Sequence, residues 1–203
     1  MFKKFFAATV FASVLMAQGA LAQAAPDELV RTNTQAILAA IKADKDLLAG
    51  DTKKIEKLAE EKILPYFNFA KMTQLAVGRN WKQATDAQKT ALTNEFRQLL
   101  VRTYSTSLSQ FRNQTIEVKP LKFAPTDTDV VVKTVISQGG GSGIPIDYSM
   151  EKAADGWKAY DVLIDGVSMV TNYRSSFNSE IQQGGIDGLV KSLAARNAKN
   201  AAK

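Results

Sequence analysis

The 203-residue sequence contains neither cysteine nor histidine. Without cysteine there can be no disulfide, no thiolate metal site, no cysteine nucleophile and no attachment point for the lipid of a bacterial lipoprotein. Without histidine, the commonest general base and the commonest metal ligand are both missing, so neither a Ser-His-Asp triad nor an H-E-x-x-H zinc site can form. We therefore expect a protein that is not an enzyme and that uses no metal and no cofactor.

Concentrated positive charge is also lacking. The formal net charge is +6, but basic and acidic residues alternate, and no basic block exceeds two residues. A nucleic-acid groove needs denser charge, which excludes nucleic acid as a partner. We interpret basic side chains such as Lys82, Arg97, Arg102 and Arg174 as solvated, with an acidic partner or a lipid headgroup as the alternative.

Residues 1–22 have the pattern of a cleavable secretion signal. Lys3 and Lys4 form a positive region, the apolar run 5–16 is too short to span a bilayer, and residues 20–22 (Ala-Leu-Ala) form an A-x-A cleavage site. We expect export to the periplasm and a mature chain that begins near Gln23. Residues 23–203 are expected to form a single domain, with 197–203 as a frayed tail.

Hydrophobic periodicity predicts helices on both sides of a run of strands. Helical spacing predicts helices within 27–44, 51–64, 68–77 and 84–111, and the last of them opens with a Thr85–Gln88 capping box. A period of two predicts strands within 115–123, 129–137, 144–152 and 157–165, and two further helices follow within 167–183 and 186–196. Consecutive strands with short turns indicate an α+β fold with an antiparallel sheet of about four strands.

The stretch 157–177, WKAYDVLIDGVSMVTNYRSSF, has some features of a catalytic elbow. Asp161 and Asp165 would lie about 13 Å apart on an extended strand, whereas paired glycosidase carboxylates need about 5 to 9.5 Å. Ser168 follows Gly166, but the G-x-S-x-G motif is incomplete and no base is available. We interpret Ser168 as a helix N-cap, and the glycine-rich segment 139–143 as a hairpin turn rather than a phosphate loop.

Several loose motifs together resemble the MlaC family, also described as toluene-tolerance auxiliary proteins. The stretch 157–177 and the following GGIDGLVKSLAAR carry part of the resemblance. Upstream, the matching motifs are L-P-Y-F at 64–67, L-x-x-G at 75–78, a tryptophan followed by AT-x-x-Q at 84–88, and F-x-x-x-L-x-x-x-Y at 96–104. The similarity runs over nearly the whole expected mature chain and keeps the order of the motifs.

This resemblance implies a twisted antiparallel sheet wrapped by about six or seven helices, with an NTF2-like part and a helical part around an apolar cavity. The cavity would hold phospholipid acyl chains, so that the phospholipid is cargo rather than cofactor. The family acts as a soluble periplasmic carrier that maintains the lipid asymmetry of the outer membrane. Its partners would be an outer-membrane lipoprotein–porin complex and the MCE-domain subunit of an inner-membrane ABC transporter.

The resemblance also predicts that the apolar faces of the expected strands and helices line this cavity. From the sheet we expect Val132, Ile146, Tyr148, Met150, Tyr160, Val162 and Ile164. From the helices we expect Phe67, Leu75, Phe96, Leu99, Leu100, Tyr104, Met169, Val170 and Tyr173. We expect the cavity to exceed the usual small-ligand range of about 300 to 1,000 Å³. A periplasmic chaperone or adaptor with a solid core, and a hydrolase on an NTF2-like scaffold, are the alternatives.

Overall fold

The computed structural model describes residues 23–109, 114–137 and 143–201. The chain begins with helices α1 (Pro26–Ala43), α2 (Lys45–Ala49) and α3 (Thr52–Lys62), the 3₁₀ helix η1 (Leu64–Tyr66), helix α4 (Phe69–Val77), the 3₁₀ helix η2 (Gly78–Gln83) and helix α5 (Asp86–Ser109). It continues with strands β1 (Thr115–Val118), β2 (Asp129–Ser137), β3 (Ile144–Ala153), β4 (Gly156–Ile164) and β5 (Val167–Ser168), and with helix α6 (Thr171–Ala201). The expected signal sequence and most of the glycine-rich turn at 139–143 lie outside the described residues.

The five strands form one antiparallel sheet in the order β1-β2-β3-β4-β5. Burial alternates along β2, and the even-numbered residues Val130 to Ile136 face the interior. The α+β class and the antiparallel sheet are therefore confirmed. The short strand β5 differs from the expectation, which placed its residues in a helix. Asp165 and Gly166 have φ angles of 50° and 79°, as in a type I′ hairpin turn, and this turn folds the chain back onto β4.

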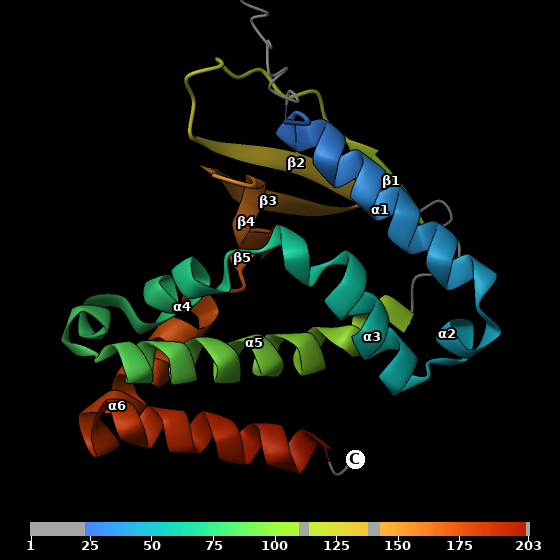
Figure 1. Ribbon diagram of the computed structural model, residues 1–203. Coiled ribbons are helices and arrows are strands. Elements are labelled where there is room, and N and C mark those ends of the chain that lie inside the picture. Colours follow the sequence, from blue (N-terminus) through green and yellow to red (C-terminus); the bar gives the residue numbers. More distant parts are fainter. Residues whose placement is uncertain (1–22, 110–113, 138–142, 202–203) are drawn as a thin grey trace, which may run out of the picture.

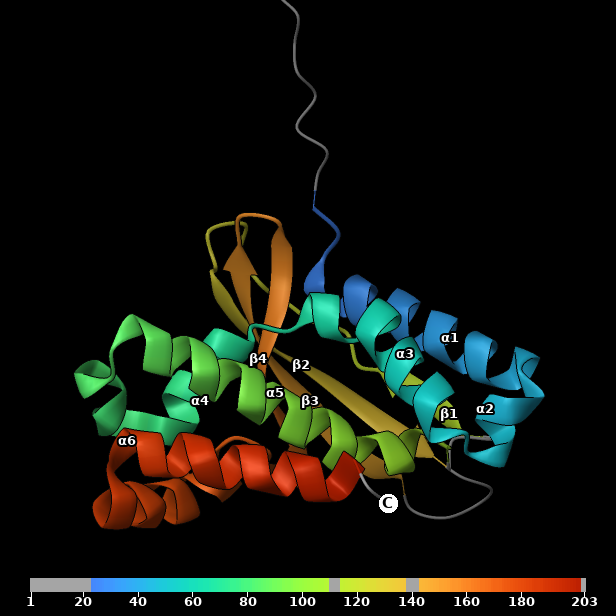
Figure 2. The same cartoon turned by 60° about the horizontal axis from the view of Figure 1, so that its bottom comes forward.

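The helices form two groups that contact different parts of the sheet (Figures 1 and 2). Helix α1 contacts β1 and β2, whereas α4, α5 and α6 contact one another as a separate helical layer. Helix α3 joins the groups, because it contacts both α1 and α5. Within α6, Gly185 has a φ angle of 68° and breaks the helix into two segments, which confirms the two helices expected at this end of the chain. None of the described helices is long and apolar enough to cross a membrane.

The buried apolar side chains of the described residues form three separate clusters. The helical cluster, between α4, α5 and α6, includes Met72, Leu92, Phe96, Phe177 and Leu189. The sheet cluster joins Val30 of α1 to Val118, Val130, Val132, Met150, Trp157 and Ala159. The corner cluster contains Ile41, Leu47, Ile55 and Leu58. Phe67 packs against both the helical and the sheet cluster, so it links these two cores.

The chain end that we expected to fray is helical through Ala201. Asn197 is only 3% exposed, and its side-chain amide donates hydrogen bonds to the backbone carbonyl and to the carboxylate of Glu95, at 2.9 and 2.7 Å. The Arg102 guanidinium donates to the carbonyl of Asn197. These bonds connect the end of α6 to α5.

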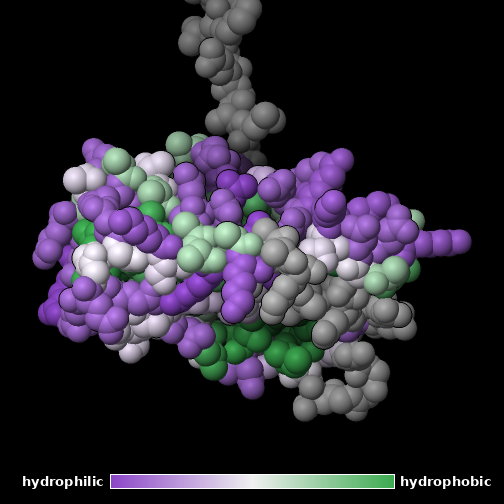
Figure 3. Space-filling view, turned by 90° about the horizontal axis from the view of Figure 1, so that it is seen from below, coloured by the Kyte–Doolittle hydropathy of each residue, from purple (hydrophilic) through white to green (hydrophobic). Residues whose placement is uncertain are grey.

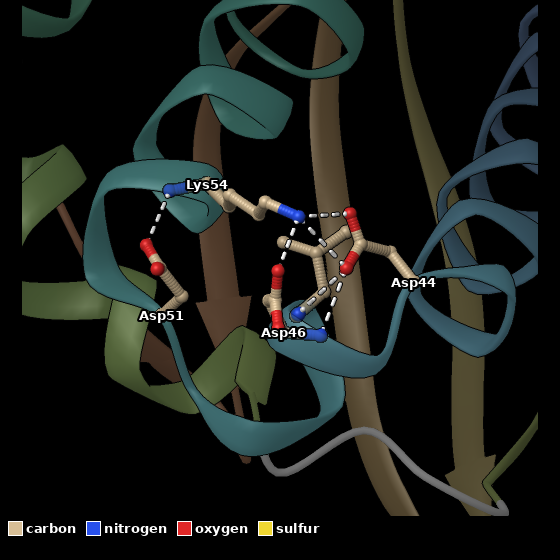
Figure 4. Close-up of polar contacts among 5 residues, drawn as sticks. Asp44, Asp46, Asp51 and Lys54 are labelled. Carbon is tan, nitrogen blue, oxygen red and sulfur yellow. Dashed lines mark hydrogen bonds and ion pairs between the residues drawn. The ribbon is translucent and has the colours of Figure 1, made fainter.

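Ion pairs of Lys54 connect α3 to α2, where the two helices meet (Figure 4). Its ammonium lies 2.9 Å from Asp44 Oδ2 and 2.6 Å from Asp46 Oδ2. Asp44 also caps α2 by accepting from the backbone N–H of Asp46, and Asp51 caps α3 by accepting from the N–H of Lys54. The hydrogen bond from Lys54, with that of the Asp46 N–H, holds the pKa of Asp44 below its usual range.

Replacing Lys54 with methionine should lower the melting temperature slightly at pH 7, because Asp44 and Asp46 lose their shared cation. Since the folded-state pKa of Asp44 is depressed, this stabilisation is present above the unfolded-state pKa of about 3.9 and is lost as the pH falls through the folded-state pKa. Melting curves of wild type and Lys54→Met should therefore converge in acid. The exposed neighbour Lys53→Met is the control, and a Lys54→Met deficit that persists unchanged down to about pH 2 would contradict this account.

Candidate functional site

A cavity of about 800 Å³ lies between the sheet, α1, α3 and α5. It lies between the helical, sheet and corner clusters, each of which contributes residues to its wall. Its volume falls within the range of about 300 to 1,000 Å³ that is usual for small-ligand pockets, so our expectation of a larger pocket was wrong. The cavity nevertheless confirms that the sheet and the helices do not close into one solid core.

The wall of the cavity is predominantly apolar. The helices and η1 supply Leu29, Val30, Asn33, Thr34, Ile37, Leu38, Ile41, Ala59, Ile63, Leu64, Tyr66, Phe67, Phe69, Met72, Leu100, Val101 and Tyr104. The sheet and its flanking residues supply Gln114, Ile116, Ile136, Ile144, Ile146, Tyr148, Met150, Ala159, Val162, Ile164 and Met169. No charged side chain occurs among these described wall residues. Burial raises the pKa of the Tyr148 phenol to about 12, so this wall residue is also uncharged at neutral pH.

The structure brings only part of the predicted wall together. The cavity gathers Phe67, Leu100, Tyr104, Ile146, Tyr148, Met150, Val162, Ile164 and Met169. Phe96, Leu99 and Val170 are instead buried in the helical cluster, with Leu75 and Tyr173 packed against it, and Val132 is fully buried in the sheet cluster. An apolar stripe indicates that a helix face is buried, but it does not distinguish a solid core from the wall of a cavity.

Tyr160 is the predicted wall residue that a β-bulge displaces. The register shifts between β3 and β4 so that Met150 pairs with Ala159 while Ser149 pairs with Asp161, which leaves Tyr160 as the extra residue. Ala159 takes the wall position that strict alternation assigns to Tyr160. The Tyr160 hydroxyl donates to Asp129, and the Lys71 ammonium lies 3.6 Å from the centre of the ring. Burial, followed by the bond to Asp129, raises the pKa of Tyr160 to about 12.

Helix α1 supplies wall residues that the sequence analysis missed. Val30, Ile37, Leu38 and Ile41 line the cavity, and their helical spacing is visible in the sequence. That spacing could have identified them as a buried face. It could not have shown that α1 crosses β1 and β2 rather than packing with α4 to α6, because no local signal specifies the surface opposite a stripe.

Apolar surface continues from the wall to the outside of the molecule. The wall residue Ile144 is 52% exposed and Val167 is 61% exposed, and the strand register places Val167 beside Ile164. On the face shown in Figure 3, apolar side chains gather in one area near its lower edge, whereas most of the remaining surface there is hydrophilic. Exposed apolar patches are typical of surfaces that contact a membrane or another protein.

The candidate catalytic elbow is a structural joint. Asp161 is buried and accepts hydrogen bonds from the N–H of Val162 at 2.8 Å, the N–H of Val170 at 3.2 Å and the hydroxyl of Ser168 at 2.6 Å. Ser168 in turn accepts from the N–H of Thr171 at 3.0 Å. Its hydroxyl therefore satisfies a free backbone amide as expected, but Ser168 lies in β5 and α6 begins only at Thr171, so it is not the N-cap residue. Among the described residues, no group of three or more acidic side chains is placed to hold a metal ion.

Comparison with known proteins points to one family. A family model described as MlaC protein matches residues 31–195. The chain is 22% identical over 196 residues to the intermembrane phospholipid transport system binding protein MlaC of Haemophilus influenzae, over 94% of this chain and 92% of that protein. It is 23% identical over 163 residues to the toluene tolerance protein ttg2D of Pseudomonas putida, over 80% of this chain and 75% of that protein.

A solved structure is similar over most of the fold. It is the phospholipid-binding protein from Ralstonia solanacearum in complex with a phospholipid, with 40% sequence identity and a TM-score of 0.81. The similarity covers 88% of this chain and 99% of that chain. The names of the Haemophilus influenzae relative and of this structural neighbour both refer to phospholipid.

Replacing Asp161 with alanine should lower the free energy of unfolding by about 2 to 4 kcal/mol, because two backbone N–H groups and one hydroxyl lose their buried acceptor. Ser168→Ala should cost about 1 kcal/mol, since Asp161 keeps its backbone donors. Urea denaturation measures both values. Asp165→Asn is the control at an exposed turn position where asparagine tolerates a positive φ. Equal losses for Asp161→Ala and Asp165→Asn would overturn the structural role given to Asp161.

Proposed function

Because the chain belongs to the MlaC family, we propose that it is a periplasmic carrier that covers the acyl chains of a phospholipid and moves the lipid between the two membranes. The observation that carries this proposal is the cavity of about 800 Å³ with an apolar, uncharged wall. The proposal is also supported by the solved structure of a protein with 40% sequence identity in complex with a phospholipid. A chaperone or adaptor with a solid core would not need such a hollow.

The energetics explain why a lipid needs a carrier in water. Burying one methylene is worth about 0.8 kcal/mol. Two acyl chains have roughly thirty methylenes, so exposing them to water costs on the order of 20 kcal/mol. A bare phospholipid therefore cannot cross an aqueous compartment at a useful rate. A wall of aliphatic and aromatic side chains removes most of that cost and requires no chemical reaction.

The route of transport is the finer part of the proposal. The Haemophilus influenzae relative is named as a component of an intermembrane phospholipid transport system, which supports a carrier that works between membranes. We place the chain in the periplasm, with residues 1–22 as the cleaved export signal. Its exchange partners would be the outer-membrane lipoprotein–porin complex and the MCE-domain subunit of the inner-membrane ABC transporter. The Ser168 hydroxyl and the Asp161 carboxylate are engaged with each other, which supports a role without catalysis.

The predicted residues that lie at the cavity form the proposed acyl-chain site. They are Phe67, Leu100, Tyr104, Ile146, Tyr148, Met150, Val162, Ile164 and Met169. We add the α1 face of Val30, Ile37, Leu38 and Ile41 to this set. Of the remaining predicted residues, Tyr160 lies at the bulge and contacts Asp129 and Lys71, and the others belong to the helical and sheet clusters or pack against them.

Neighbouring residues of β4 allow a matched test. Ile164 lines the cavity, whereas Leu163 points to the opposite face of the sheet, where it pairs with Asp147 and Ser168. In Ile164→Asp a carboxylate would replace apolar wall, so bound phospholipid should fall by about tenfold or more. Leu163→Asp should keep the wild-type amount. Solvent extraction of the purified proteins and mass spectrometry measure phospholipid per chain, and circular dichroism verifies folding.

A second pair of variants tests the cavity without adding charge. Ala59 of α3 lines the cavity, whereas Ala87 of α5 is exposed. Ala59→Phe places a ring in the hollow and should reduce bound lipid, while Ala87→Phe should not. Full lipid occupancy in folded Ile164→Asp and in folded Ala59→Phe would rule out the cavity as the acyl-chain site.

A further inference from the structure

We propose that a second, polar hollow beside the cavity binds the headgroup of the phospholipid, with Arg97 contacting the phosphate and Glu60 contacting an ammonium group. This inference rests on the proposed function and deepens it. The polar hollow has a volume of about 350 Å³ and lies between α3 and α5. It is lined by Glu56, Glu60, Leu64, Asn94, Arg97, Gln98, Val101 and Arg102.

The polar hollow adjoins the cavity. Leu64 and Val101 line both spaces, so these two half-buried side chains form the partition between them. The Arg97 guanidinium also lies 6.0 Å from the ring centre of Phe69, which is itself a wall residue of the cavity. In this proposal, the Leu64 and Val101 side chains move aside so that a lipid whose acyl chains fill the cavity places its polar end between α3 and α5.

The two spaces have opposite chemistry. The described wall of the cavity carries no charged side chain, whereas the polar hollow carries two arginines, two glutamates and two amides. Elsewhere, the wall residue Ile144 of β3 and Val167 of β5 present apolar side chains to solvent. A phospholipid has the same division, because its tails avoid water and its headgroup carries charge. The polar hollow thus matches the headgroup better than the Ile144 side does.

Within the polar hollow, one arginine and one glutamate are available to bind a ligand. Arg102 lies 4.0 Å from Glu56 and also donates to the carbonyl of Asn197. In the described part of the chain, no hydrogen bond or ion pair engages Arg97 or Glu60, and both are exposed. A guanidinium binds phosphate through parallel N–H donors, and a carboxylate accepts from an ammonium. The chemistry of these two side chains suits a phosphate diester that carries a primary ammonium, and the proposal gives Arg97 the headgroup contact that was the alternative to a solvated role.

The test compares lipids that share their acyl chains and differ only in the headgroup. Wild type and variants are equilibrated with vesicles that contain equal amounts of palmitoyl-oleoyl phosphatidylethanolamine, phosphatidylglycerol and diacylglycerol, and the bound lipids are quantified by mass spectrometry. Arg97→Gln should lower the preference for the two phospholipids over diacylglycerol by about threefold to tenfold. The wild-type preference should weaken at high salt, because exposed charges are screened.

Separate variants test the phosphate contact of Arg97 and the ammonium contact of Glu60. Glu60→Gln should remove the preference for phosphatidylethanolamine over phosphatidylglycerol and should leave the preference of both over diacylglycerol intact. Arg97→Lys, which keeps the charge without the paired donors, should fall between wild type and Arg97→Gln. Arg79→Gln, at an exposed position outside both hollows, is the matched control and should have the wild-type lipid profile.

The outcomes separate this inference from the function on which it rests. If Arg97→Gln and Arg97→Lys bind lipid with wild-type headgroup preference, the headgroup site is wrong while the carrier function stands. If Glu60→Gln alone has no effect, the ammonium contact is wrong and the phosphate contact remains. If the wild-type protein takes up none of the three lipids, including diacylglycerol, the proposed function fails and the headgroup site fails with it.

Discussion

The sheet and helices α1, α3 and α5 present apolar side chains to one another across a hollow, and the rest of the structure must keep these surfaces apart. An empty apolar cavity lacks the dispersion contacts of a filled core, so it lowers stability. The buried apolar side chains of the helical, sheet and corner clusters supply the packed core around it. A ligand that fills the hollow adds the missing contacts and stabilises the folded state.

Hydrogen bonds and ion pairs outside the cavity connect the helices and strands that form its wall. Asn68 and Lys71 of the α4 end both reach Glu151 of β3 at 2.6 Å, and so tie the helical layer to the sheet. Asp161 binds the start of α6 to β4, which places Met169 at the wall. Lys54 of α3 pairs with Asp44, which lies between α1 and α2, and with Asp46 of α2 (Figure 4). Because none of these charged side chains belongs to the described wall, the wall itself can stay free of charge.

Local signals in the sequence predicted most elements and few of their mutual positions. The Thr85–Gln88 capping box forms as expected, because caps depend only on neighbouring residues. Alternation placed Ile146, Tyr148, Val162 and Ile164 on one face, but it failed at Tyr160, where a bulge depends on pairing with β3. Phe96 and Val170 were expected at the cavity and lie in solid core, since periodicity reports burial and not what lies opposite. Whether the core closes is a property of the assembled fold.

The most direct test of the central claim is native mass spectrometry of the intact chain purified from a periplasmic extract without added lipid. A carrier with an occupied cavity should show the mass of the polypeptide plus that of a phospholipid, and the extra mass should disappear when the protein is denatured. Added phospholipid should also raise the melting temperature of the delipidated protein. A folded protein that shows only the bare polypeptide mass, with a melting temperature indifferent to phospholipid, would contradict the account.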